Sequence, residues 1–223
     1  MRNKNIFLAS LLLAGFGLGA LSVGCHSRKI DSTLRVHLGE NPKSLDPIFA
    51  SDALAAEIQG QFYESLFQYN YKKRPYVLEP LLAQEMPSYS KDGLTVTIKI
   101  KPKIFFQDDP CFVGGKGREL VAQDFVFALN RLVDPKNASE GAWLFEGKGA
   151  TFSAPDKYTL VIDLKKKYPQ LIYALAMGPT VPMAHEAVEK YGAELTNHPV
   201  GTGPYVMKEY TRNSRIVLEK NPT

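Results

Sequence analysis

Residues 94–101 carry the most regular pattern of the sequence and limit what the chain can fold into. Apolar side chains stand at Leu94, Val96, Ile98 and Ile100, and Thr or Lys stands at every position between and just after them. Successive side chains of a β-strand point to opposite faces, so this alternation predicts a strand with one apolar and one polar face. Such a strand belongs to an antiparallel sheet that is buried on one side only.

Shorter patterns of both periodicities follow one another along the rest of the chain. Apolar residues at helical spacing predict helices at residues 52–67, 122–133, 169–177 and 185–191. Alternating apolar residues predict further strands at residues 34–38, 160–164, 205–210 and 215–219. Helices and strands are interspersed without a strict strand–helix–strand repeat, so the predicted fold class is mixed α/β.

The first 24 residues have the features of an export signal rather than of a folded domain. Arg2 and Lys4 precede an uncharged stretch at residues 6–23, and polar residues resume after Cys25. A retained membrane helix is the alternative, since the stretch lies at the lower end of the roughly 17–25 residues that span a bilayer. Glycines within the stretch disfavour a stable helix, which favours a cleaved signal at residues 1–24.

Cys25 follows Leu21-Ser22-Val23-Gly24, which resembles the lipobox of bacterial lipoproteins. The resemblance implies a diacylated Cys25 as the first mature residue and a tether at residues 25–33; two acyl chains suffice for stable membrane attachment. Ala20-Leu21-Ser22 offers the alternative of an ordinary small-x-small cleavage site. If Cys25 is lipidated, Cys111 has no disulfide partner and is expected to be a small buried apolar residue.

Composition and missing motifs exclude several classes of protein. Hydrophobic residues make up 44% of the chain and aromatics 11%, which excludes an intrinsically disordered protein. A formal net charge of +4 is too small to indicate nucleic acid as a partner. The sequence contains no Gly-x-Ser-x-Gly, His-Glu-x-x-His or Walker motif, and its four His lack zinc-ligand spacing. It therefore predicts no enzyme, no cofactor and no metal site.

Asp108 and Asp109 form an acidic pair that could bind a cation. They stand directly before Pro110, and the residues around them indicate a turn. The prediction is a solvated turn, with cation binding as the alternative.

A series of short motifs, taken in order, is similar to the motifs of one family. They are Ser44-Leu45-Asp46-Pro47, Tyr63-Glu64-Ser65-Leu66, Glu79-Pro80-Leu81-Leu82-Ala83 with Lys91-Asp92-Gly93-Leu94-Thr95, Ile100-Lys101-Pro102-Lys103-Ile104-Phe105-Phe106, Ala122-Gln123-Asp124-Phe125-Val126 with Arg131 and Asp134-Pro135, Gly201-Thr202-Gly203-Pro204-Tyr205, and Ile216-Val217-Leu218-Glu219-Lys220-Asn221-Pro222. Together they resemble the bacterial extracellular solute-binding proteins of family 5, typified by the oligopeptide- and dipeptide-binding proteins of ABC importers. The chain departs from that pattern at Pro102-Lys103, where an acid or Gly is usual, and at Val121, where a Thr cap is usual.

The resemblance implies a periplasmic-binding-protein-like fold of type II, in which two lobes joined by a hinge enclose the ligand. It assigns residues 34–62 to the start of the first lobe, residues 63–164 to a small mixed α/β domain, and residues 165–223 to the continuation of the first lobe. The second lobe is expected beyond Thr223, so the sequence is interpreted as the incomplete, N-terminal part of such a protein.

By the same resemblance, the protein is a solute-binding lipoprotein of an ABC importer. It would capture peptides between its lobes, hold them through their backbone, and deliver them to the permease subunits as a monomer on the periplasmic or cell-surface face of a membrane. A non-transport surface lipoprotein, such as a sensor, adhesin or chaperone-like protein, is the alternative function. Nickel, haem, sugar or opine are alternative ligands.

Four residues are expected to contact the ligand by counting from the family's motifs. Ser51 and Ala53 fall where the oligopeptide-binding members contact ligand, and they also stand at the cap and first turn of a predicted helix. Gly141 falls where those members carry a ligand-touching Tyr. Trp143, the only Trp, is the candidate to replace that ring as an apolar platform, with core packing as the alternative.

Overall fold

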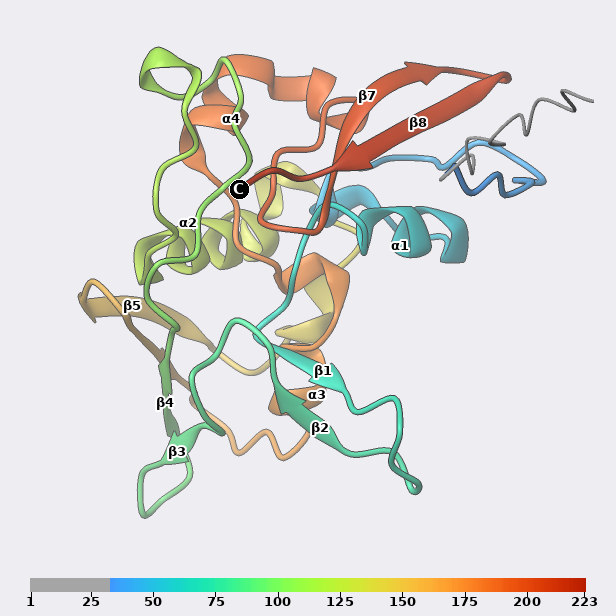
Figure 1. The fold of residues 1–223 in the computed structure, drawn as a ribbon. Helices are drawn as coiled ribbons and strands as arrows, with labels where there is room; N and C mark the ends of the chain where they lie inside the picture. Colours follow the sequence, from blue (N-terminus) through green and yellow to red (C-terminus); the bar gives the residue numbers. More distant parts are fainter. Residues whose placement is uncertain (1–32) are drawn as a thin grey trace, which may run out of the picture. The chain divides into compact units, whose positions relative to one another are not determined.

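The computed structural model describes residues 33–223, of which Leu38–Thr223 form one compact unit (Figure 1). The predicted signal at residues 1–24 and the lipidation site at Cys25 lie outside the described residues. Within residues 33–223, none of the helices has the length and apolar character needed to cross a membrane.

The compact unit is mixed α/β, as the sequence predicts. Its α-helices are α1 (Ala53–Gln59), α2 (Ala122–Val133), α3 (Leu171–Ala174) and α4 (His185–Tyr191). Its strands are β1 (Phe67–Tyr69), β2 (Leu78–Pro80), β3 (Ser88–Tyr89), β4 (Thr95–Lys99), β5 (Thr151–Asp156), β6 (Thr159–Asp163), β7 (Tyr205–Thr211) and β8 (Arg215–Lys220). Short 3₁₀ helices are η1 (Pro47–Phe49), η2 (Val113–Gly115), η3 (Pro135–Asn137), η4 (Ala142–Leu144), η5 (Gly178–Thr180) and η6 (Gly192–Thr196).

The largest sheet has four strands in the order β3–β4–β6–β5, and every neighbouring pair is antiparallel. Val96 of β4 lies opposite Ile162 of β6, and Ile98 lies opposite Leu160. These four side chains are buried, while the Thr and Lys residues between them on β4 are partly or fully exposed. The half-buried antiparallel strand predicted from the alternation is therefore confirmed.

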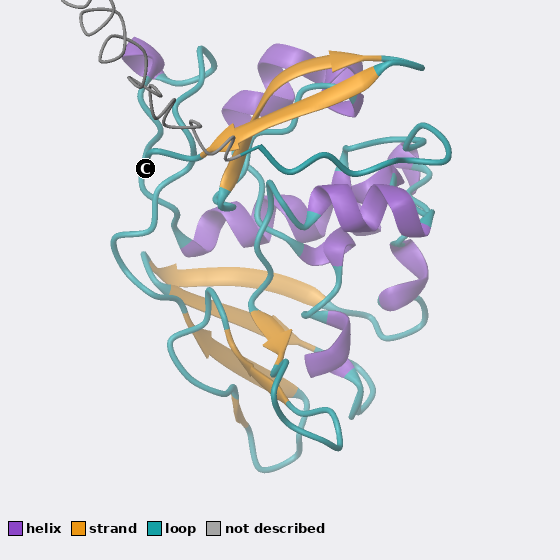
Figure 2. Ribbon diagram, turned by 45° about the vertical axis from the view of Figure 1, so that its right-hand side comes forward, coloured by secondary structure: helices purple, strands orange, loops and turns teal. Residues whose placement is uncertain are grey.

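Helix α2 covers one face of this sheet and packs against β5 and β6 (Figure 2). Its bounds agree with the prediction, and Phe125, Leu129 and Leu132 on its covered face are fully buried. The apolar side chain of Val121 cannot cap the helix. Its backbone N–H donates instead to Oδ2 of Asp124 over 2.9 Å, so the carboxylate of the first turn satisfies one of the free donors.

Arg118 fastens α2 to α4. Its guanidinium donates to both carboxylate oxygens of Asp124, at 2.9 and 2.6 Å, and to both of Glu186, at 2.6 and 2.8 Å. The Asp124 side chain is only 3% exposed. Two-point contacts of this kind fix geometry as well as adding energy, so the two helices hold a defined relative position.

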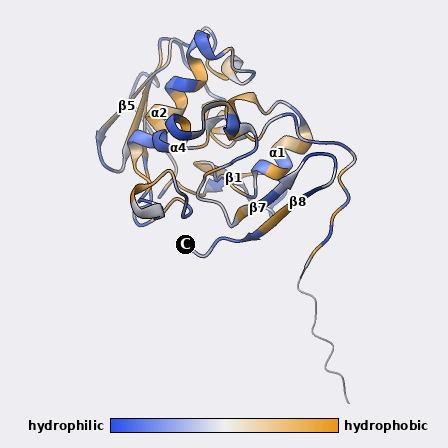
Figure 3. Ribbon diagram, turned by 90° about the horizontal axis from the view of Figure 1, so that it is seen from above, coloured by the Kyte–Doolittle hydropathy of each residue, from blue (hydrophilic) through white to orange (hydrophobic). Residues whose placement is uncertain are grey.

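Two apolar clusters fill the unit. The larger one lies between the four-stranded sheet and helices α2, α3 and α4. The smaller one contains Leu45, Ile58, Phe62, Tyr63 and Val181. The apolar side of the β7–β8 hairpin packs against it, which places this hairpin beside α1 (Figure 3).

The strand predicted at residues 34–38 is wrong. Residues 33–38 join none of the sheets that the described residues form, and Leu34 and Val36 are 86% and 67% exposed. An alternating pattern supplies one apolar face, but a strand also needs a neighbouring strand along its edge. Leu38, at the end of the pattern, packs against the smaller cluster.

The helix predicted over residues 52–67 begins as expected and ends early. Asp52 caps α1, since its Oδ1 accepts the N–H of Ala55 over 2.7 Å. The helix ends at Gln59 before Gly60, and the N–H of Phe62 bonds to the carbonyl of Gln59 over 2.9 Å in a tighter turn. Helix α3 is likewise shorter than the predicted 169–177: it spans Leu171–Ala174, and the N–H groups of Ala176 and Met177 then bond to carbonyls only three residues back.

Candidate functional site

Ser51 and Ala53 lie at the exposed start of α1. Both residues are exposed, and Asp52 between them turns inward to cap the helix. Oδ2 of Asp52 also accepts the N–H of Lys43 over 3.2 Å, which ties the start of the helix to the preceding loop. The two predicted ligand residues therefore stand on a braced segment with their side chains open to solvent.

The structure joins this segment to the one that holds Gly141 and Trp143. The carbonyl oxygen of Ile48 accepts the Ser139 hydroxyl over 2.8 Å and the N–H of Glu140 over 3.2 Å. Ser139 Oγ in turn accepts the N–H of Gly141 over 3.1 Å. Two segments that are about ninety residues apart in the sequence thus meet at one carbonyl group.

Gly141 is buried and has no room for a side chain. A Cβ at this position would lie 2.7 Å from Cβ of Pro179 and 3.0 Å from Cδ1 of Leu132. Trp143 is 60% exposed, so the alternative of core packing does not describe it. The exposed side chains of Ser51, Ala53 and Trp143 on these joined segments form what we call the candidate ligand surface.

Asp46 and Arg131 form a buried ion pair next to the Ile48 junction, and the sequence motifs did not predict this pair. The guanidinium of Arg131 donates to both carboxylate oxygens of Asp46, at 2.8 and 2.6 Å. The Arg131 side chain is 13% exposed and the Asp46 side chain is 3% exposed. Oδ1 of Asp46 also accepts the N–H of Ile48 over 3.3 Å, so the ion pair fixes the residue whose carbonyl joins the two segments. The only sign of this pair in the sequence was that Arg131 stands next to the apolar positions of the predicted helix at residues 122–133.

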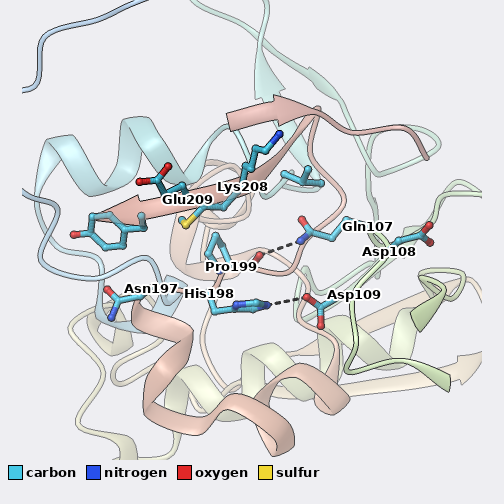
Figure 4. Close-up of a pocket in the computed structure, with 11 residues that line it drawn as sticks. Gln107, Asp108, Asp109, Asn197, His198, Pro199, Lys208 and Glu209 are labelled. Atoms are coloured by element: carbon cyan, nitrogen blue, oxygen red, sulfur yellow. Dashed lines mark hydrogen bonds and ion pairs between the residues drawn. The ribbon is translucent and has the colours of Figure 1, made fainter. Parts of the chain in front are cut away.

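A second candidate region is a cavity of about 310 Å³ beside β7 (Figure 4). It is lined by residues 107–109, 197–199 and 206–210. At its base, Nε2 of His198 lies 2.8 Å from Oδ2 of Asp109, and the Tyr191 hydroxyl donates to Oδ1 over 2.6 Å. The rings of Tyr191 and His198 stack with centroids 4.0 Å apart.

Asp109 corrects the expectation of a solvated acidic turn. Its side chain is 5% exposed, and it accepts the N–H of Cys111 over 2.8 Å besides its contacts with Tyr191 and His198. Burial alone would raise its pKa, but the hydrogen bonds from His198, Tyr191 and Cys111 outweigh burial and hold the pKa well below the usual range. Asp108 is less buried and binds Lys116 and Gly117. Within residues 33–223, no cluster of His, Cys, Asp and Glu has the arrangement of a metal site.

Cys111 was expected to be a small buried apolar residue, and it is only partly buried. It is free and packs partly buried against the larger cluster. Burial, together with the Asp109 carboxylate, raises its pKa to about 12. A thiol that stays protonated at neutral pH is a poor nucleophile, so it adds no reactivity to the cavity.

A comparison with known protein families agrees with the motifs and the fold. Residues 77–223 match the family described as "Bacterial extracellular solute-binding proteins, family 5 Middle". The chain belongs to this family. The match includes Gly141, Trp143 and the cavity, while Ser51 and Ala53 precede it.

Relatives of this family 5 chain include the glutathione-binding protein GsiB of Escherichia coli O1:K1 / APEC. The two are 33% identical over 185 residues, which make up 83% of this chain and 34% of GsiB. The family 5 chain therefore spans about a third of the length of the curated relatives that it matches.

Two solved structures of similar fold hold different kinds of ligand. DppA from Helicobacter pylori, in complex with the peptide STSA, is 26% identical with a TM-score of 0.71, and the match covers 82% of this chain and 38% of DppA. MoaA from A. tumefaciens R10, in complex with mannopinic acid, is 26% identical with a TM-score of 0.72. The match covers 82% of this chain and 35% of MoaA. These neighbours confirm that the chain corresponds to part of a periplasmic-binding-protein fold.

Proposed function

We propose that this chain supplies one wall of the ligand cleft of a peptide-binding component of an ABC importer. The observation that carries the proposal is the junction at the Ile48 carbonyl, which sets Ser51 and Ala53 on one segment and Trp143 on the other. In a family 5 chain, these are the segments that the resemblance to peptide-binding members assigns to the ligand. By that resemblance, the facing wall belongs to the remaining length of the longer relatives.

A peptide ligand fits the chemistry of this surface better than a single compact solute. Trp143 offers a broad apolar face, which suits side chains of varied shape. The Ser51 hydroxyl and exposed backbone at the start of α1 offer hydrogen bonds to a peptide backbone. The names of the relatives agree, since GsiB binds glutathione, itself a tripeptide, and DppA was solved with STSA.

A sugar-derived acid is the second candidate ligand, because MoaA was solved with mannopinic acid. Native mass spectrometry of the protein purified from the cells that make it separates the two. We expect a series of retained peptide masses that disappears on denaturation. A single retained mass that corresponds to a sugar-derived acid such as mannopinic acid would overturn the peptide assignment.

Export, a lipid anchor and a non-catalytic role complete the proposal. The basic start, the uncharged stretch and Cys25 support diacylation, and a monomer on the periplasmic or cell-surface side of the membrane agrees with delivery of ligand to permease subunits. The mass of the N-terminal peptide after proteolysis tests the anchor. We expect two acyl chains on Cys25 and none after C25S; an unmodified N-terminus at Cys25 or Val23 would contradict lipidation.

A further inference from the structure

The loop between β1 and β2 carries an unusual density of exposed aromatic side chains. It projects away from α1 and α2 at the lower right of Figure 1. Tyr69, Tyr71 and Tyr76 are 51%, 89% and 64% exposed. We call residues 69–77 the tyrosine tip. Large apolar surfaces gathered in this way, rather than scattered singly, mark interaction sites.

The tyrosine tip is also strongly basic. Lys72, Lys73 and Arg74 are consecutive and exposed, and residues 69–77 contain no acidic side chain. The nearest acid along the chain is Glu79, whose two oxygens accept the amides of Gln68 and Asn70 at 3.0 and 2.6 Å. The tip therefore presents three positive charges without a neutralising carboxylate of its own.

Local contacts hold the tip in one shape. Oδ1 of Asn70 accepts the N–H groups of Lys72 and Lys73, both at 3.0 Å, and so closes the turn. The guanidinium carbon of Arg74 stands 4.2 Å above the ring of Tyr76. The Tyr76 ring meets the Tyr69 ring edge to face, with centroids 6.1 Å apart. Because the backbone turn, Arg74 and two of the rings are already arranged, binding orders fewer groups and loses less entropy.

We infer that the tyrosine tip contacts anionic phospholipid headgroups. Tyrosine favours the boundary between acyl chains and water, where its ring is in apolar surroundings and its hydroxyl in polar ones. Lys and Arg are attracted to the negative surface that anionic lipids create. The combination of unpaired cations with amphipathic rings complements such a surface in both charge and polarity.

This inference is separate from the peptide cleft, since it uses neither Trp143 nor Ser51. It gains weight from the proposed anchor at Cys25. Thirteen residue steps separate Cys25 from Leu38, where the compact unit begins, and such a chain reaches at most about 45 Å. A lipidated protein would thus stay close to the bilayer, where weak contacts act at high effective concentration.

Hydrogen–deuterium exchange of the full chain in the presence of vesicles tests the inference. Vesicles of phosphatidylcholine with about 30% phosphatidylglycerol are compared with vesicles of phosphatidylcholine alone. We expect exchange in residues 68–80 to slow by about fivefold or more on the anionic vesicles only. About 0.5 M salt should remove the protection, because it shortens the screening length to roughly 4 Å.

Two variants and a matched control make the result decisive. K72Q/K73Q/R74Q should abolish the protection, and Y71S/Y76S should weaken it without a change of charge. K165Q/K166Q/K167Q removes the same charge from another exposed run and should leave the protection intact. An unchanged denaturation midpoint shows that each variant folds. Protection that is absent on anionic vesicles, equal on neutral ones, or retained in K72Q/K73Q/R74Q would overturn the inference.

Discussion

The guanidinium of Arg131 in α2 forms a two-point ion pair with the carboxylate of Asp46 at the start of η1, with N–O distances of 2.8 and 2.6 Å. The pair bridges residues that are 85 positions apart in the sequence. Arg131 also donates to Sδ of Met183, and its guanidinium carbon lies 5.9 Å from the Phe49 ring. The loop that carries the Ile48 carbonyl is thus fastened to the helix that covers the sheet.

Removal of one partner of this pair is predicted to destabilise the fold. R131M leaves the Asp46 carboxylate, 3% exposed, without its counter-charge, so the free energy of unfolding should fall by about 3–5 kcal/mol. Urea denaturation followed by circular dichroism measures the loss. K208M removes the exposed pair of Lys208 with Glu219 and should cost no more than about 1 kcal/mol. Equal losses in the two variants would contradict the structural role of the pair.

Gly141 should not tolerate a side chain. A Cβ would lie 2.7 Å from Pro179 and 3.0 Å from Leu132, so G141A should lower the free energy of unfolding by about 1–3 kcal/mol. The control is G39A, since a Cβ at Gly39 meets nothing within 4 Å. A G141A protein as stable as G39A would show that Pro179 of η5 and Leu132 move aside freely.

Trp143 should report ligand binding through its fluorescence. It is the only Trp of the chain and is 60% exposed, so W143A should change stability by less than about 1 kcal/mol. Titration of the 223-residue chain with millimolar peptide should shift its emission to the blue, because the ring loses water.

The affinity itself should fall about tenfold in W143A and be largely restored in W143F, which keeps an aromatic face. Calorimetry measures both. Binding of undiminished affinity in W143A would remove Trp143 from the candidate ligand surface.

Asp109 should make the stability of the protein depend on acid pH. Its pKa is lowered in the folded state, so the carboxylate stabilises the fold above its unfolded pKa of about 4. That contribution is lost as the pH falls from about 4 towards the lower folded pKa. D109N should be about 1–3 kcal/mol less stable than the natural protein at pH 7, with the gap narrowing below about pH 4. Urea midpoints across the pH range test this; a constant gap would contradict it.

Secondary structure was predictable where a periodic pattern is followed by a residue that ends a helix, such as Pro or Gly. Helix α2 ends before Pro135 and α4 ends before Gly192, whose φ of 49° suits glycine, and both ranges agree with the prediction. The alternating pattern at residues 34–38 did not lead to a strand, because a strand forms only where a neighbouring strand meets its edge. The division of the chain at residues 62 and 164 stays a prediction.

The candidate site was predictable only in part. Motif counting placed Ser51, Ala53, Gly141 and Trp143, and their roles in binding stay predictions. It did not show that the Ile48 carbonyl joins their segments, nor that Asp109 meets His198 across 89 positions. The spacing of residues within one segment carries no information about such contacts.

The sequence by itself determined the mixed α/β class, the half-buried strand and the family resemblance. These follow from local periodicity, from backbone limits at Pro and Gly, and from motifs that are each contained in one short segment. The tertiary structure alone decided that Asp46 meets Arg131, that Gly141 is enclosed and that Asp109 is buried. Those outcomes depend on which distant segments pack together, and packing is settled by the fit of the whole core rather than by any one stretch of chain.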